Sequence, residues 1–192
     1  MLDFSAVRQK TKRIADLADG LTKEDLRSLT NEMIDTMMEM IAECVDADVI
    51  LVPDDPEAFD PDAATEGEVD LSWTLGHVIV HVTASSEEAA FLAAELARGA
   101  PRREGRSRNE VPWTAVTTVE GCRRRLEESR RMRLATLDVW PDEPHLDNIY
   151  RYLPTSSPIN AMSQFIFGLM HDDSHLGQIA DIVGQAKAAR AV

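Results

Sequence analysis

Residues 171–179 read HDDSHLGQI and lie in a long, mostly apolar stretch near the C-terminus. Four residues are about one turn of an α-helix, so the side chains of His171 and His175 lie on the same face. Two imidazoles on one face can bind the same ion, but a metal site then needs a further ligand from elsewhere in the chain. This stretch therefore predicts a helix that supplies part of a metal site.

Residues 71–82, LSWTLGHVIVHV, hold a second pair of histidines at the same spacing, His77 and His81. Three neutral imidazoles leave one coordination position open for water or substrate, as in catalytic zinc sites, whereas four ligands close the site. One such pair in a helix often arises by chance, and its histidines are then hydrogen-bonded core residues. Two pairs, which together hold four of the five histidines, favour a metal site over that interpretation.

The residues around His81 indicate that the second pair faces a cavity. On a helix, the polar residues Thr74, His77, His81, Ser85 and Glu88 form one narrow stripe with apolar residues on both sides. Such a stripe is not typical of a solvent-facing surface, so we expect it to line an internal polar cavity. The last helix is apolar on two sides, and we predict that part of this surface is covered by a second subunit in a homodimer.

Composition predicts one globular domain over residues 1–192, with 28% charged and 44% hydrophobic residues. The net charge of −14 repels polyphosphate, so nucleic acid is not an expected partner. No apolar run reaches the roughly 20 residues that span a bilayer, and the N-terminus lacks the apolar core of a signal peptide. We therefore expect a cytoplasmic protein that acts on a small molecule. Its two cysteines, Cys44 and Cys122, are expected to be reduced packing residues.

The apolar periodicity is helical nearly throughout, and it indicates no strand. The expected helices cover about 4–18, 23 or 30 to 46, 71–98, 118–139 and 157–188. The expected N-caps are Thr22, Thr117 and Ser157, and Gly20 is an expected terminator. The expected inward faces are Met33, Met37, Ile41 and Cys44 on the second helix, and Val119, Cys122, Leu126, Ser129 and Leu137 on the fourth. This pattern predicts an all-α four-helix bundle with a short extra N-terminal helix.

Two connections have an unusual composition. Residues 52–70, VPDDPEAFDPDAATEGEVD, are acidic and proline-rich, which predicts a solvated crossover; the alternative is a lid over the end of the bundle. Residues 101–108, PRREGRSR, are rich in arginine, which is typical of a loop that ends a helix, with an anion site as the alternative. His145 lies in a proline-rich loop and is expected at the surface.

The sequence resembles the DinB-like superfamily of bacterial metal-binding four-helix bundles, which includes thiol-dependent S-transferases and mycothiol-dependent maleylpyruvate isomerases. The resemblance spans about residues 25–187 and depends on Trp73 followed by His81 on one helix, then on HDDSHLGQI with His171, His175 and Gln178 on the last. It implies that His81, His171 and His175 bind a divalent ion such as zinc or nickel.

By the same resemblance, His77 is a pocket residue beside the ligands, and a low-molecular-weight thiol is the cosubstrate. A divalent ion lowers the pKa of a bound thiol or water, so that a nucleophile is present at neutral pH. We therefore hypothesise a metal- and thiol-dependent transferase or isomerase that acts on a small electrophile. The alternative is a non-catalytic bundle that binds metal or a small ligand in stress response or regulation. Candidates for orienting the imidazoles or for proton transfer are Glu88, Asp172, Asp173 and Gln178.

Overall fold

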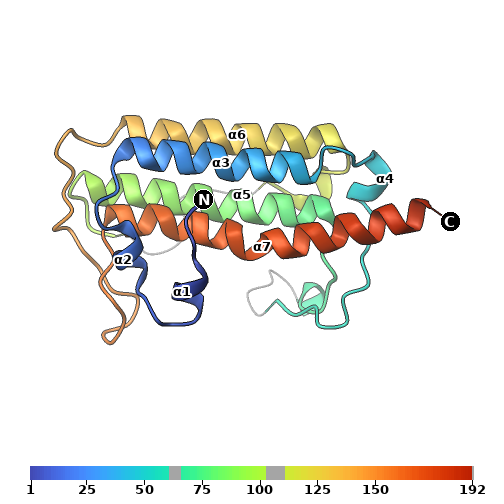
Figure 1. Cartoon of the computed structure of the whole chain (residues 1–192), viewed down its shortest axis with the longest axis horizontal. Helices are drawn as coiled ribbons and strands as arrows, with labels where there is room; N and C mark the ends of the chain where they lie inside the picture. Colours follow the sequence, from blue (N-terminus) through green and yellow to red (C-terminus); the bar gives the residue numbers. More distant parts are fainter. Residues whose placement is uncertain (61–65, 103–110, 192) are drawn as a thin grey trace.

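Four long helices form the body of the protein. The computed structural model describes residues 1–60, 66–102 and 111–191. Its long helices are α3 (Lys23–Met40), α5 (Leu75–Ala97), α6 (Val119–Asp138) and α7 (Ala161–Arg190), and they lie side by side (Figure 1). Within the described ranges, the only β-type pairing is one isolated antiparallel bridge between Tyr150 and Ile159. The expected all-α bundle is confirmed.

The arrangement of the helices brings the two histidine-bearing segments together. α5 packs chiefly against α7 and α6, whereas α3 packs against α6 and α7. α3 and α7 run in one direction along the bundle, and α5 and α6 run in the opposite direction (Figure 1). α5 and α7, which carry the histidines, are therefore antiparallel neighbours. None of the helices in the described part of the chain is long and apolar enough to cross a bilayer.

The N-terminal segment forms two short helices instead of the single helix expected over residues 4–18. They are α1 (Ser5–Arg8) and α2 (Ile14–Ala18). Between them Lys10 adopts a φ of 59°, which is the left-handed conformation and cannot continue a right-handed helix. Gly20, with a φ of 76°, follows α2 and ends this segment as expected.

The second expected helix is divided as well. α3 ends at Met40, and residues near its expected end form a separate turn, α4 (Asp46–Val49). Two carboxylates hold this turn in place: Asp48 accepts the backbone N–H of Val45 at 2.8 Å, and Asp46 accepts the backbone N–H of Val119 at 2.9 Å. The chain therefore forms a separate turn at α4 and does not continue α3.

The helix starts were predicted with mixed success. Thr22 begins α3 as expected, because its hydroxyl accepts the N–H of Asp25 at 3.2 Å. α6 begins one residue later than expected, since Thr118 and not Thr117 accepts the N–H of Gly121, at 3.0 Å. The first residues expected in α7 are not helical, because the bridge to Tyr150 holds the chain extended at Ile159. α7 therefore begins after Asn160, whose side chain caps it.

α5 begins at Leu75 and not at Leu71. Thr74 is its N-cap and accepts the backbone N–H of His77 at 3.3 Å. The expectation that Trp73 and His81 share one helix is therefore wrong, because Trp73 precedes the cap. This position lets the indole fold back over the histidines of α5.

The core contains the residues expected from the helical pattern. All nine residues predicted to face inward on α6 and on the segment around α3 are buried, and both cysteines are free and buried. Charged groups are also buried between the helices. Arg133 of α6 donates to Asp172 of α7 at 2.9 Å, and Arg125 of α6 pairs with Glu87 of α5. Each of these four side chains is at most 4% exposed.

Candidate metal centre

Three histidines from two helices meet on the side of the bundle where α5 and α7 are in contact. α5 supplies His81, and α7 supplies His171 and His175. The Nε2 atoms of His81 and His171 are 3.0 Å apart, and one nitrogen from each ring lies within 4.8 Å of the others. The three rings are half-buried. The structure thus brings together the histidines that the sequence placed in one site.

The separation of these nitrogens fits a common ion. Nitrogen ligands bind zinc at about 2.0–2.1 Å, and a tetrahedral arrangement then places them about 3.4 Å from one another. The distance of 3.0 Å between the Nε2 atoms of His81 and His171 is shorter than this ligand separation. The limit of 4.8 Å for all three nitrogens is longer. Small rotations of the rings would therefore give an ion three imidazole ligands, a set that suits zinc, nickel, copper and iron.

The polar surroundings of the α7 histidines prepare them as ligands. The amide oxygen of Gln178 is 2.8 Å from His175 Nδ1, so this nitrogen carries the proton and the lone pair of Nε2 is available to a metal. Burial, together with the charge of His175, lowers the pKa of His171 to about 4. His171 is therefore neutral at neutral pH, which metal binding requires.

His77 lies outside this set and has different neighbours. Its ring stacks on Trp73, with centroids 4.5 Å apart, and on Trp113, also at 4.5 Å with an interplanar angle of 2°. Burial lowers the pKa of His77, against the opposing charges of Glu68 and Asp60. His77 is therefore one layer of an aromatic stack beside the three histidines. Trp73 also contacts two of those histidines, with ring centroids 4.5 Å from His81 and 6.1 Å from His175.

The sequence analysis missed Trp113, because its role depends on a distant part of the chain. It belongs to the short helix η2 (Trp113–Ala115), which packs against the start of α5. The close contact between η2 and α5 requires a glycine at position 76, because an added Cβ there would lie 2.1 Å from the carbonyl oxygen of Val116. A glycine at the start of an otherwise helical stretch is the one local sign of such close contact.

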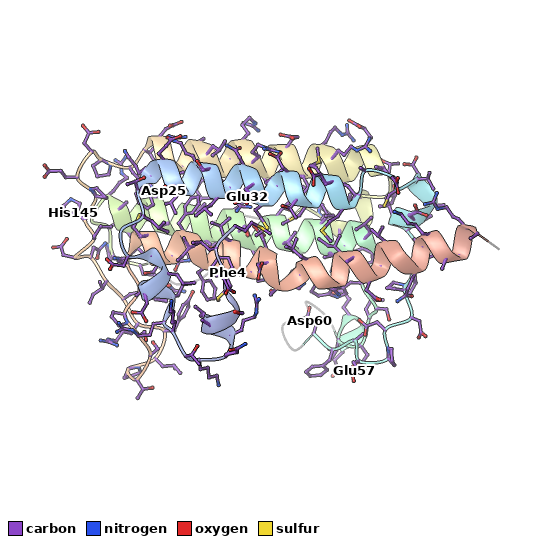
Figure 2. All side chains as sticks on the ribbon, in the orientation of Figure 1. Phe4, Asp25, Glu32, Glu57, Asp60 and His145 are labelled. Atoms are coloured by element: carbon purple, nitrogen blue, oxygen red, sulfur yellow. The ribbon has the colours of Figure 1, made fainter. Side chains whose placement is uncertain are left out.

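A cavity of about 240 Å³ opens beside His175. It is lined by Asp55, Glu57, Ala58, Phe59, Asp60, Leu71, Trp73, His175 and Gln178. Six of these nine residues come from the acidic crossover and the residue that follows it, and Figure 2 shows Glu57 and Asp60 on that segment beside α7. The described part of the crossover is therefore a wall of the site as well as a connection between helices.

A second cavity, of about 300 Å³, is lined by His77 and Trp113 of the aromatic stack. Its lining is mainly apolar and includes Ile50, Val52, Leu71, Trp113 and Val116, with His77 and four hydroxyl-bearing residues. Of the polar stripe expected on α5, Thr74 and His77 line this mainly apolar cavity, and no residue of the stripe lines the cavity beside His175.

The remaining sequence candidates lie in different environments. Asp172 is fully buried and accepts hydrogen bonds from Ser86 Oγ at 2.5 Å and from Arg133 at 2.9 Å; burial raises its pKa against these partners. Asp173 forms an ion pair with Arg8 of α1. Glu88 is half-buried on α5, two turns beyond His81.

Two loop predictions concern the periphery. His145 is exposed in the connection between α6 and α7, as expected, and lies at one end of the bundle (Figure 2). Most of the arginine-rich stretch 101–108, with the anion site given as its alternative, lies outside the described residues.

Together, the fold and this cluster define a class of protein: an all-α bundle in which two antiparallel helices bring three histidines together, one of which, His175, lines a cavity. The family model of the DinB superfamily matches residues 6–179, a range that includes all three histidines, and the chain belongs to this superfamily. No curated protein and no solved structure matches the chain. The resemblance found in the sequence is confirmed at the level of the family.

Proposed function

We propose that the protein is a metal-dependent thiol transferase or isomerase that acts on a small electrophile, with His81, His171 and His175 as the ligands of a divalent ion such as zinc or nickel. The observation that carries the proposal is the convergence of three imidazole nitrogens within 4.8 Å beside a cavity that shares His175 as a lining residue. A purely structural site would be closed by a fourth protein ligand.

The chain's own residues have separate parts in this proposal. A bound divalent ion supplies Lewis acidity, which favours the thiolate form of a coordinated thiol. Gln178 favours the tautomer of His175 that leaves Nε2 available to a metal. Trp73 and five crossover residues form the wall of the cavity beside His175; the five are Asp55, Glu57, Ala58, Phe59 and Asp60. The cavity of about 240 Å³ suits a small substrate, because pockets for larger ligands are typically about 300–1,000 Å³.

Turnover of a simple substrate pair tests the proposal. In the reaction of mercaptoethanol with chlorodinitrobenzene, the thiol sulfur bonds to the ring carbon, chloride leaves, and the thiol proton passes to solvent. We expect the metal-loaded protein to accelerate this reaction, and we expect His81→Ala and chelator-treated protein to lose the acceleration.

The matched control is His145→Ala, which removes an exposed histidine at the end of the bundle and should leave the rate unchanged. An acceleration that survives both chelation and His81→Ala would contradict the proposal. Metal retention without turnover of any thiol and electrophile would instead support a non-catalytic metal-binding bundle.

A further inference from the structure

The cavity beside His175 has a strongly acidic wall. Asp55, Glu57 and Asp60 are among its nine lining residues, and none of the nine is Lys or Arg. Glu57 is exposed, whereas Asp55 and Asp60 are half-buried. Figure 2 shows Glu57 and Asp60 together on the crossover, next to the helix that carries His175. A small molecule in this cavity therefore lies close to carboxylates.

The charge of the wall is not balanced by the histidines. Neutral imidazoles contribute no charge that would offset the carboxylates of this wall. The negative potential extends to the aromatic stack, where Asp60 and Glu68 favour the protonated form of His77. Clefts lined by one sign of charge concentrate small molecules of the opposite sign.

Phe59 adds a second feature to the same cavity. It lines the cavity between the acidic residues, yet its side chain is 70% exposed. An exposed aromatic ring next to carboxylates is a favourable place for an organic cation, because the ring face attracts positive charge and the carboxylates neutralise it. A ligand that covers Phe59 would also remove apolar surface from water, which favours binding.

We infer that this cavity selects small molecules that carry a cationic group, such as an ammonium, over molecules of similar size that carry a carboxylate. The inference rests on the proposed function, since it names the charge class of the molecule that reaches the histidines. The selection is made by Asp55, Glu57, Asp60 and Phe59, which are outside the proposed ligand set.

Three small thiols of increasing negative charge provide the test. Cysteamine is cationic, mercaptoethanol is neutral and mercaptopropionate is anionic, and all three are similar in size. Protein loaded with Co²⁺ is titrated with each thiol, and the thiolate-to-cobalt absorption gives the dissociation constants. The quantity compared is the ratio of the constants for mercaptopropionate and cysteamine. Dividing the ratio of a variant by that of the wild type cancels the different acidities of the thiols.

Three variants are measured: Asp55→Asn, Glu57→Gln and the two combined. The matched control is Asp54→Asn, which removes the same charge one residue away from Asp55, at an exposed position that does not line the cavity. We expect the preference for cysteamine to fall about two- to fivefold for each carboxylate removed, and to weaken in high salt. Asp54→Asn should keep the wild-type ratio at low salt.

An unchanged ratio in the combined variant would overturn the inference and leave the proposed function standing. A fall of the same size in Asp54→Asn would also overturn it, because the effect would then come from overall charge. Absence of thiolate absorption with all three thiols would overturn the proposed function, and this inference with it.

Discussion

His171 and Asp172 are neighbours on α7, yet they belong to two regions of opposite character. Asp172 is completely buried, and Ser86 and Arg133 bond to its two carboxylate oxygens. His171 is half-buried, its Nδ1 has no hydrogen-bond partner within the described residues, and its Nε2 points to another imidazole. One region is a polar core with its hydrogen bonds formed, and the other is a group of imidazoles with one nitrogen from each within 4.8 Å of the others.

This difference separates structural polar groups from groups that are available to a ligand. A buried charge is tolerated when partners satisfy it, and it then joins the elements that supply those partners. Ser86, Arg133 and Asp172 join α5, α6 and α7 in this way. The Nε2 atoms of His81 and His171 instead lie 3.0 Å apart, and a shared ion would explain why these two nitrogens approach so closely.

The largest expected effect comes from breaking the buried pair. Asp172→Ala leaves Arg133 charged and buried, so we expect the free energy of unfolding of the metal-free protein to fall by about 3–5 kcal/mol. Urea unfolding monitored by circular dichroism measures this free energy. The control, Asp173→Ala, breaks the more exposed pair with Arg8 and should cost no more than about 1 kcal/mol. Equal effects of the two variants would remove the distinction between the regions.

Acidification should act on the histidine region. The pKa of His171 is lowered from 6.5 to about 4, so between these values the unfolded chain binds the proton and the folded chain does not. Stability of the metal-free protein is then lost as the pH falls from about 6.5 to about 4, by on the order of 3 kcal/mol. Urea unfolding at several pH values should show this slope, and His171→Gln should reduce it. An equally steep slope in the variant would contradict the assignment.

Removal of the partner of His175 gives a smaller effect on metal binding. Gln178→Ala frees the Nδ1 of His175, and loss of such a supporting hydrogen bond typically weakens metal affinity about 10- to 100-fold. Competition with a chromogenic chelator measures the affinity. Gln185→Ala is the control, because this glutamine lies on the same helix but bonds to Asp54 and Asp181. If both variants bind metal as the wild type does, Gln178 does not support the site.

The predicted homodimer would form through apolar groups, so its disruption should leave the histidine region unchanged. Among the described residues, the exposed large apolar side chains do not lie on α7, where the sequence placed the surplus. They include Ile149, Tyr152 and Leu153 of the preceding connection, which are 53%, 48% and 64% exposed, and Tyr152 contacts Phe167 of α7. A second subunit that covers this surface would explain the exposure. Light scattering at micromolar concentration should give twice the chain mass, and Leu153→Glu should lower it with the metal content unchanged. A monomer mass for the wild type would end this prediction.

The sequence predicted what depends on helical periodicity. The bundle, its buried faces and the two histidine pairs follow from spacing along single helices, whereas the choice of His81 over His77 as the partner of His171 and His175 came from the family resemblance. The aromatic stack and the cavity wall do not, because Trp113 and residues 55–60 reach the site through loops whose course the local sequence does not determine. Asp172 shows the limit most clearly. It is adjacent to His171 in sequence, but a rotation of about 100° around the helix places it in the core and away from the cavity.

The most direct test of the central claim is the metal content of four variants, His81→Ala, His171→Ala, His175→Ala and His77→Ala, prepared identically and dialysed before elemental analysis. The account predicts that the first three release the ion and that His77→Ala retains it, since the ring of His77 is stacked between two indoles. Retention in His81→Ala together with loss in His77→Ala would contradict the ligand assignment. Loss in all four would mean a closed four-histidine site with a structural ion.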